Sequence, residues 1–249
     1  MIRNKWLKQT MGAIYYYFTI KIKKTRKLLL YKYIQWNGIE IWWLDNPAPI
    51  NKNTTQVKYV DYLDKKDLEK NHPHLKNKEL WKIDYICKAD NLDKIKSNSQ
   101  DFIIANHLLE HLENPIKALL ERYRVLKDKW IIFMAIPDKR KTRDHNRKRT
   151  KLEHIISDFI HPSKARNQEH YLDFAQIHLS DLNLIEKEAK RLESINFSIH
   201  YHVFIEEDVL AIIERCNSKK HTKFNIIHIK HTTKNPADNE FIIILQAIK

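Results

Sequence analysis

Polar side chains stand at the carboxyl ends of several short apolar runs in this sequence. Asp61 closes "VKYVD", Asn106 closes "DFIIAN" and is followed by His107, and Asp138 closes "WIIFMAIPD". A carboxylate accepts hydrogen bonds from hydroxyl and N–H groups, and a histidine exchanges protons near neutral pH. If the runs are parallel strands, these side chains meet at one edge of a sheet, where ligands bind in such folds.

The runs that carry these residues are predicted to be buried parallel strands. They cover residues 39–41, 57–61, 101–106 and 130–138, and residues 107–129 have helical spacing with a break at Pro115. Two later runs, "FSIHYHVFI" (197–205) and "NEFIIILQAI" (239–248), predict strands that close the sheet with an antiparallel edge. The expected fold class is therefore α/β, a Rossmann-like, doubly wound and mostly parallel sheet with an antiparallel edge strand.

Composition indicates one globular domain with a strongly basic balance. The chain has 249 residues and a formal net charge of +14, which suits acidic partners but does not choose among nucleic acid, nucleotide-linked substrates and an anionic membrane surface. Part of this excess can be a lysine-rich composition rather than selection for a polyanion. Cys87 and Cys216 are far apart and form neither a metal-ligand spacing nor a disulfide framework, so a reducing compartment is expected.

Residues 1–37 form a basic and aromatic segment ahead of the predicted sheet. Their apolar stretch "MGAIYYYFTI" is too short to cross a bilayer, which takes about 20 residues. The segment is expected to be a helical extension that caps the domain, with a membrane-surface role as the alternative. Residues 38–249 are expected to form the main domain, with residues 139–168 inserted as a basic lid.

Five blocks of the sequence carry a family resemblance. They are "GIEIWWLDNPAPI", "KYVDYLDKKDLEKNHPHL", "DFIIANHLLEHLENPIKALLERYRVLK", "IIFMAIPDKRKTRDHNRKRTKLEHIISDF" and "IHYHVF". Together they resemble class I S-adenosylmethionine-dependent methyltransferases, in particular the type 11-like branch. The resemblance runs from Gly38 to the C-terminus, and its central blocks are more specific than a lone glycine pattern. It implies methyl transfer from S-adenosylmethionine, while the acceptor stays open.

The predicted strand ends and the resemblance together suggest where the cofactor binds. Glu40 and the turn at Trp42 are expected to face the methionine part, and Asp61 is expected to accept hydrogen bonds from the ribose hydroxyls. The resemblance implies that Asp90 lies beside the adenine. Asn106 is expected to line the cofactor near the methyl group, while capping a helix is the alternative role for Asp61.

Catalysis of methyl transfer needs positioning more than covalent help, and a base only where the acceptor must lose a proton. The candidates for this base are His107, His111 and Asp138, and packing against the sheet is an equally good explanation for His111. Arg140 and Arg143 of the basic lid are candidates to hold an anionic group of the acceptor. The alternative is that these arginines belong to a solvated surface.

His200 and His202 alternate in a predicted strand, so both rings are expected on one face. Two histidines hold a metal only if further ligands converge, and "HPH" at 72–74 offers no obvious partner. No metal site is therefore predicted. The resemblance favours a substrate-pocket or packing role for the two residues.

Glycine is rare, and tryptophan stands where the family pattern has glycine. The chain has two glycines, Gly12 and Gly38, against six tryptophans. The pattern places glycine at Trp42, a small residue at Trp43, and glycine in the turn at Trp130. We interpret at least Trp42 and Trp130 as UGA codons, which some bacteria read as glycine. Genuine tryptophans at these positions would instead indicate a catalytically inactive relative.

Two functional classes follow from these features. The first is a methyltransferase that acts on a small-molecule or glycan-related acceptor. The second is an inactive, methyltransferase-like binding module that uses its basic surface for an anionic partner. A nucleic-acid partner is disfavoured because the lid does not interleave aromatic and basic residues. The expected location is the cytoplasm, with peripheral membrane contact through the N-terminal segment as an option.

Overall fold

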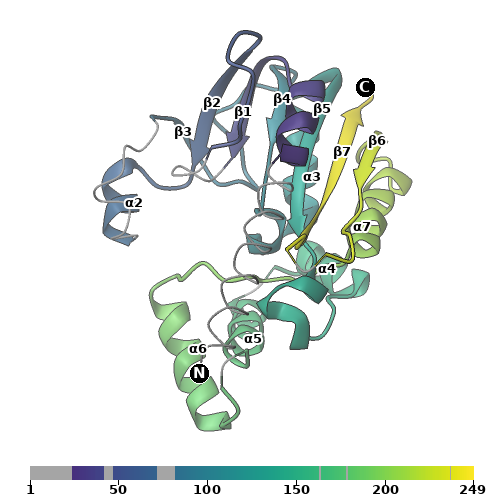
Figure 1. Ribbon diagram of the computed structural model, residues 1–249. Coiled ribbons are helices and arrows are strands. Elements are labelled where there is room, and N and C mark those ends of the chain that lie inside the picture. Colours follow the sequence, from purple (N-terminus) through teal and green to yellow (C-terminus); the bar gives the residue numbers. More distant parts are fainter. Residues whose placement is uncertain (1–23, 42–46, 72–81, 163, 178, 236) are drawn as a thin grey trace, which may run out of the picture.

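A computed structural model describes residues 24–41, 47–71, 82–162, 164–177, 179–235 and 237–249. Its centre is a seven-stranded sheet in the order β3-β2-β1-β4-β5-β7-β6 (Figure 1). The strands are β1 (Trp36–Ile41), β2 (Thr55–Asp61), β3 (Ile83–Ile86), β4 (Gln100–Ile104), β5 (Leu126–Pro137), β6 (Phe224–Lys230) and β7 (Glu240–Ala247). The first five run parallel, and β7 is antiparallel to both β5 and β6. The predicted fold class is confirmed.

One predicted strand is wrong. Residues 197–205 are not a strand, and the antiparallel partner of β7 is β6, which the sequence analysis did not predict. The backbone of this segment makes hydrogen bonds to several separate parts of the chain instead of to one neighbouring strand. The His202 N–H donates to the Glu110 carbonyl, and the Phe204 carbonyl accepts from the Lys139 N–H.

Helices cover both faces of the sheet, as a doubly wound fold requires. One face packs against α3 (Pro115–Val125), α4 (Leu152–Ile160) and α7 (Glu206–Ser218). The helix at residues 24–33, dark purple in Figure 1, covers the other face. It buries Leu30, and Ile34 just after it, against Phe102 of β4 and Phe133 of β5. These residues are therefore a layer of the domain.

The glycine in β1 is required by a close approach between strands. A Cβ atom at Gly38 would lie 2.4 Å from the backbone oxygen of Phe102 in β4, a distance that real Cβ atoms do not adopt. Any larger side chain would push β1 away from β4.

Helices α5 (Lys164–Ala175) and α6 (Leu182–Ser194) lie beyond the carboxyl ends of the parallel strands (Figure 1). They share a small apolar cluster of their own, built on Tyr171, Ile185 and Leu192. The predicted basic lid, residues 139–168, therefore contains two short 3₁₀ turns (Lys139–Lys141 and Arg143–Asn146), α4 and the start of α5. A short helix, α2 (Lys65–Asn71), follows β2. Within the described ranges, no helix is both long and apolar enough to span a membrane.

Candidate functional site

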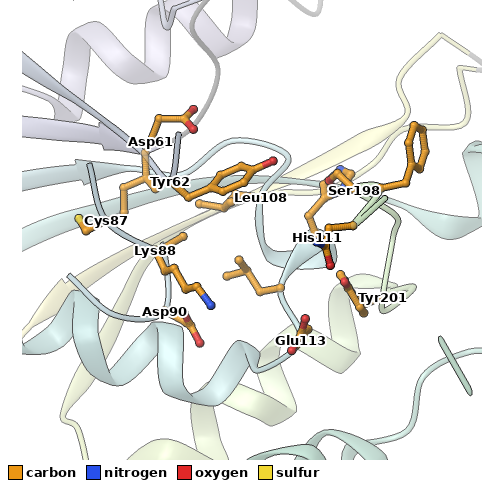
Figure 2. A pocket seen from close by; sticks show the side chains of 15 residues that line it. Asp61, Tyr62, Cys87, Lys88, Asp90, Leu108, His111, Glu113, Ser198 and Tyr201 are labelled. Atoms are coloured by element: carbon orange, nitrogen blue, oxygen red, sulfur yellow. Dashed lines mark hydrogen bonds between the residues drawn. The ribbon is translucent and has the colours of Figure 1, made fainter. Parts of the chain in front are cut away.

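A cavity of about 210 Å³ opens at the carboxyl ends of β1 and β2. Because β1 lies between β2 and β4, and the chain crosses over between these neighbours, this is the switch point where doubly wound sheets bind ligands. Figure 2 shows Asp61 and Asp90 on one side of the cavity and His111 and Tyr201 on the other. Three of the predicted site residues, Asp61, Asp90 and His111, thus line one cavity.

Asp61 presents an unsatisfied carboxylate oxygen at the end of β2. Its Oδ1 accepts a hydrogen bond from the Leu63 N–H at 3.1 Å, while its Oδ2 is buried and has no hydrogen-bond partner. Burial raises the pKa of this carboxyl to about 6. A buried acceptor without a partner is costly, and a donor group on a ligand in the cavity would satisfy it.

His111 lies opposite, at the end of the 3₁₀ turn Leu109–His111. Its Nδ1 lies 3.1 Å from the Ser198 hydroxyl, and its ring meets the edge of His200 with centroids 4.5 Å apart. Burial lowers the pKa of His111 to about 3, helped by the nearby His200. The ring is therefore neutral at physiological pH and acts as a hydrogen-bonding group more than as a strong base.

Asp90 belongs to the loop after β3, beside Cys87 and Lys88, which also line the cavity. Its Oδ2 pairs with the Lys117 ammonium of α3 at 3.4 Å. Asp90 and Asp61 are far apart along the chain but line the same cavity.

Two predicted cofactor residues accept hydrogen bonds from backbone N–H groups and do not line this cavity. Both carboxylate oxygens of Glu40 accept from the Ala48 N–H, at 2.9 and 3.1 Å, and burial raises the pKa of Glu40 to about 8. The Asn106 Oδ1 accepts from the Ala135 N–H at 3.2 Å and ties the end of β4 to β5. Trp42, another predicted cofactor residue, lies outside the described residues.

His107 and Asp138, two predicted catalytic residues, are held in ion-pair clusters outside the cavity lining. His107 Nε2 lies 2.7 Å from Glu240 Oε2, and Arg26 also binds Glu240. Burial raises the pKa of Glu240, but these two partners outweigh burial and lower it to about 2. Asp138 is fully buried, and its carboxylate is held by the Arg140 guanidinium through Nε at 2.9 Å and Nη2 at 2.5 Å.

The predicted substrate residues also lie outside the cavity lining. Arg140 binds Asp138, and Arg143 is exposed in the second 3₁₀ turn. His200 Nδ1 lies 2.6 Å from Asp144 Oδ2; burial lowers the pKa of His200, but this contact outweighs burial and raises it. His202 points away into a buried cluster, where burial lowers its pKa to about 3. The two histidines therefore diverge, because their segment is not a strand.

Several cavity residues were missed by the sequence analysis. Tyr62 follows Asp61 directly, and its position after a strand end was a usable signal. On the wall opposite Asp61, the missed residues include Glu113, Asn196, Phe197, Ser198 and Tyr201. Asn196 to Tyr201 come from the segment around the wrongly predicted strand, and no local pattern placed it beside β2.

The strand order and the cavity at its switch point are those of a Rossmann-like, mostly parallel sheet with an antiparallel edge. Residues 46–134 match the family described as a methyltransferase domain, type 11. This match covers 89 of the 249 residues and supports a relationship to class I S-adenosylmethionine-dependent methyltransferases. The unpartnered Asp61 oxygen fits this cofactor, because a ribose hydroxyl would supply the missing donor.

Solved structures give further likenesses. A methyltransferase from Thermotoga maritima, suggested to be a histamine N-methyltransferase, has 15% identity and a TM-score of 0.49, over 99% of this chain and 97% of that one. A methyltransferase from Methanosarcina mazei has 14% identity and a TM-score of 0.47, over 86% and 93%. A Rhodobacter sphaeroides protein, provisionally assigned to zinc-dependent alcohol dehydrogenases, has 10% identity and a TM-score of 0.51, over 92% and 90%. Only the TM-score of 0.51 supports a shared fold, and none of these likenesses identifies a substrate for this chain. No curated protein matches the chain.

Proposed function

We propose that this chain is an active methyltransferase that transfers a methyl group from S-adenosylmethionine to a small-molecule or glycan-related acceptor. The observation that carries the proposal is the buried Asp61 oxygen without a hydrogen-bond partner at the edge of the switch-point cavity. A hydroxyl donor on a bound ligand would satisfy this oxygen and offset the cost of its burial.

The roles divide between the two walls of the cavity. Asp61 would bind the ribose hydroxyls and Asp90 would lie toward the adenine, because both line the wall beside β2 and β3. The cofactor supplies a methyl group already activated on a sulfonium. His111, with its ring held by Ser198, would lie beside the acceptor and help to position it in line with the methyl group.

The far wall supports an acceptor of modest size with several hydroxyl groups. Phe197 and Tyr201 offer aromatic surface, and Ser198 and Glu113 offer hydrogen-bonding groups next to His111. This mixture is typical of sites that orient a ligand by a few polar contacts within an apolar pocket. Arg140 and Arg143 remain candidates for an acceptor that extends beyond the cavity, and replacing both by glutamine would then raise KM for the acceptor but leave cofactor affinity unchanged.

The alternative is an inactive methyltransferase-like module that binds an anionic partner, which the net charge of +14 favours. Calorimetry with S-adenosylmethionine separates the two. The methyltransferase proposal is supported if the chain or its Trp42→Gly variant binds S-adenosylmethionine and the Asp61→Asn substitution weakens this binding. If neither chain binds S-adenosylmethionine although both are folded, the methyltransferase proposal is refuted and the binding module is the remaining explanation. The free Cys87 and Cys216 favour a reducing compartment such as the cytoplasm.

A further inference from the structure

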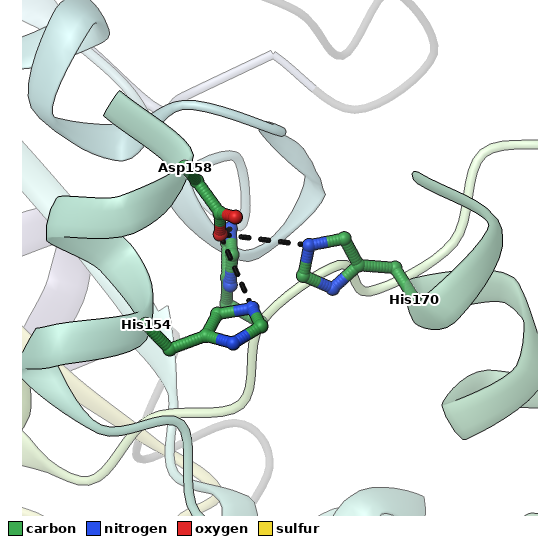
Figure 3. A group of neighbouring side chains, drawn as sticks. His154, Asp158 and His170 are labelled. Atoms are coloured by element: carbon green, nitrogen blue, oxygen red, sulfur yellow. Dashed lines mark ion pairs between the residues drawn. The ribbon is translucent and has the colours of Figure 1, made fainter. Parts of the chain in front are cut away.

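Four side chains from three separate elements converge beside the lid, at a place that the proposed methyl transfer does not use. His154 and Asp158 lie one turn apart on α4, His170 lies on α5, and His202 lies in the segment that leads to α7. Their ligand atoms all lie within 4.8 Å of one another. Figure 3 shows the Asp158 carboxylate directed between the rings of His154 and His170. None of the four lines the switch-point cavity.

The distances match a tetrahedral metal site better than a hydrogen-bonded cluster. The Asp158 Oδ2 atom lies 3.2 Å from His154 Nε2, 3.5 Å from His170 Nε2 and 3.8 Å from His202 Nε2. Ligands bound to zinc at about 2.0–2.1 Å in a tetrahedron lie about 3.3 Å from one another. An N–H···O bond prefers about 2.9 Å, and the longer two distances exceed the usual range.

Burial strengthens this interpretation. His170, His202 and Asp158 are all at least nine-tenths buried, yet three imidazole nitrogens face the same carboxylate oxygen. The competing partner of His202 Nε2 is the Glu113 carbonyl at 3.4 Å, which is also long for a hydrogen bond. A cation at the centre would satisfy all four ligand atoms at once, as buried charged groups require. The His154 side chain is 36% exposed, which leaves a path from solvent.

We propose that His154, Asp158, His170 and His202 form a binding site for one divalent transition-metal ion, with zinc as the preferred metal. Three imidazoles and one carboxylate suit zinc, whereas magnesium and calcium prefer oxygen ligands. Four protein ligands close the coordination sphere, so the role is structural. The metal joins α4 and α5 to the segment of Phe197–Tyr201 and thereby fixes the acceptor wall of the cavity.

Metal content of the full chain, expressed without a histidine tag, tests the site directly. The protein is stripped with a chelator, dialysed against zinc or cobalt(II), and measured by elemental mass spectrometry. We expect one metal ion per chain, a tetrahedral cobalt(II) absorption spectrum, and a higher Tm for the zinc-loaded protein. His170→Gln and Asp158→Asn should each weaken metal binding at least about tenfold. His161→Gln, which changes an exposed histidine at the end of α4, should bind like the wild type.

A folded wild-type chain that takes up neither metal would overturn the proposal. So would Asp158→Asn or His170→Gln variants that bind as tightly as the His161→Gln control. If a ligand variant does not fold, the wild-type stoichiometry and cobalt spectrum still decide the question. Metal binding is measured without any methyl acceptor or cofactor, so its failure is independent of the proposed enzymatic function.

Discussion

Replacing Asp61 by asparagine should stabilise the chain and at the same time weaken its binding of S-adenosylmethionine. The side chain is 2% exposed, and burial raises its pKa from 3.8 to about 6. One pKa unit corresponds to about 1.4 kcal/mol, so keeping this carboxyl ionised at neutral pH costs up to about 3 kcal/mol. Asparagine has nearly the same shape and keeps an oxygen that can accept from the Leu63 N–H.

The dependence of stability on pH follows from the linkage between folding and protonation of Asp61. The folded chain binds the Asp61 proton more tightly than the unfolded chain does, so stability falls as pH rises from about 4 to about 6 and then stays low. The advantage of Asp61→Asn should therefore be largest above pH 6 and vanish near pH 4. Each kcal/mol raises Tm by about 2–4 °C in a domain of this size.

The affinity for the cofactor should change in the opposite direction. Losing the charged acceptor for the ribose hydroxyls should cost roughly 1.5–3 kcal/mol of binding free energy. Thermal unfolding at pH 4 and pH 7.5, with calorimetry at pH 7.5, measures both effects. Asp93→Asn, an exposed change in the neighbouring loop, should leave Tm and affinity unchanged. A lower Tm for Asp61→Asn, or an unchanged affinity in an otherwise binding chain, would refute the assigned role.

Three other substitutions test the roles of His111, Arg147 and Glu40. His111→Gln should lower kcat but keep cofactor affinity within about twofold, because the ring lies on the acceptor wall; equal loss of both in steady-state assays and calorimetry would contradict this division. Arg147→Met should destabilise the chain by about 1–3 kcal/mol in urea denaturation, because the buried Asp144 loses the guanidinium at 2.8 Å but keeps its contact with His200 at 2.6 Å. Glu40→Gln should change stability by less than about 1 kcal/mol at pH 7, because a pKa of about 8 means that Glu40 is already protonated there; a larger urea-midpoint change would show an ionised group.

The sequence predicted four of the five parallel strands because they contain buried apolar runs, whereas β3, in which half-buried and exposed residues alternate, was missed. Asp61, Asp90 and His111 were found from strand ends and from the resemblance, and all three line the cavity. Glu40 and Asn106 look the same in sequence, yet their buried oxygens accept backbone N–H groups. Which partner a buried polar group finds depends on tertiary geometry, and strand position alone does not reveal it.

The cluster of the proposed metal site was not predicted from the sequence, for a related reason. His202 was considered as a ligand, but its expected partner was a histidine on the same strand face. The partners in the structure are His154, Asp158 and His170, which lie in the basic lid and the helix beyond it. Only His154 and Asp158 have a recognisable local spacing, one helical turn, and a single such pair is too common to indicate a site.

Backbone geometry gives an independent test of the glycine hypothesis. Trp36, at the start of β1, has a φ of 71° and is 61% exposed, so a bulky side chain stands in a conformation that favours glycine. Trp130 lies within β5 without a positive φ, so its backbone does not require glycine, and the structure gives no support to the UGA codon that the sequence suggested at Trp130. The left-handed residue there is its neighbour Lys129, with a φ of 65°.

We therefore expect the Trp36 codon to be UGA, together with that of Trp42, which lies outside the described residues. In the recombinant chain, Trp36→Gly should raise stability by about 1 kcal/mol, because it removes a left-handed conformation that costs an L-residue roughly 1–2 kcal/mol. Trp130→Gly is the matched control and should lower stability, because it deletes a side chain that packs on the main core and puts glycine inside a strand. Thermal unfolding compares the two variants, and peptide mass spectrometry of the natural protein identifies the residue at position 36. Tryptophan in that peptide, or a Trp36→Gly variant no more stable than the parent chain, would favour a genuine tryptophan at this position and weaken the case for a misread glycine at Trp42.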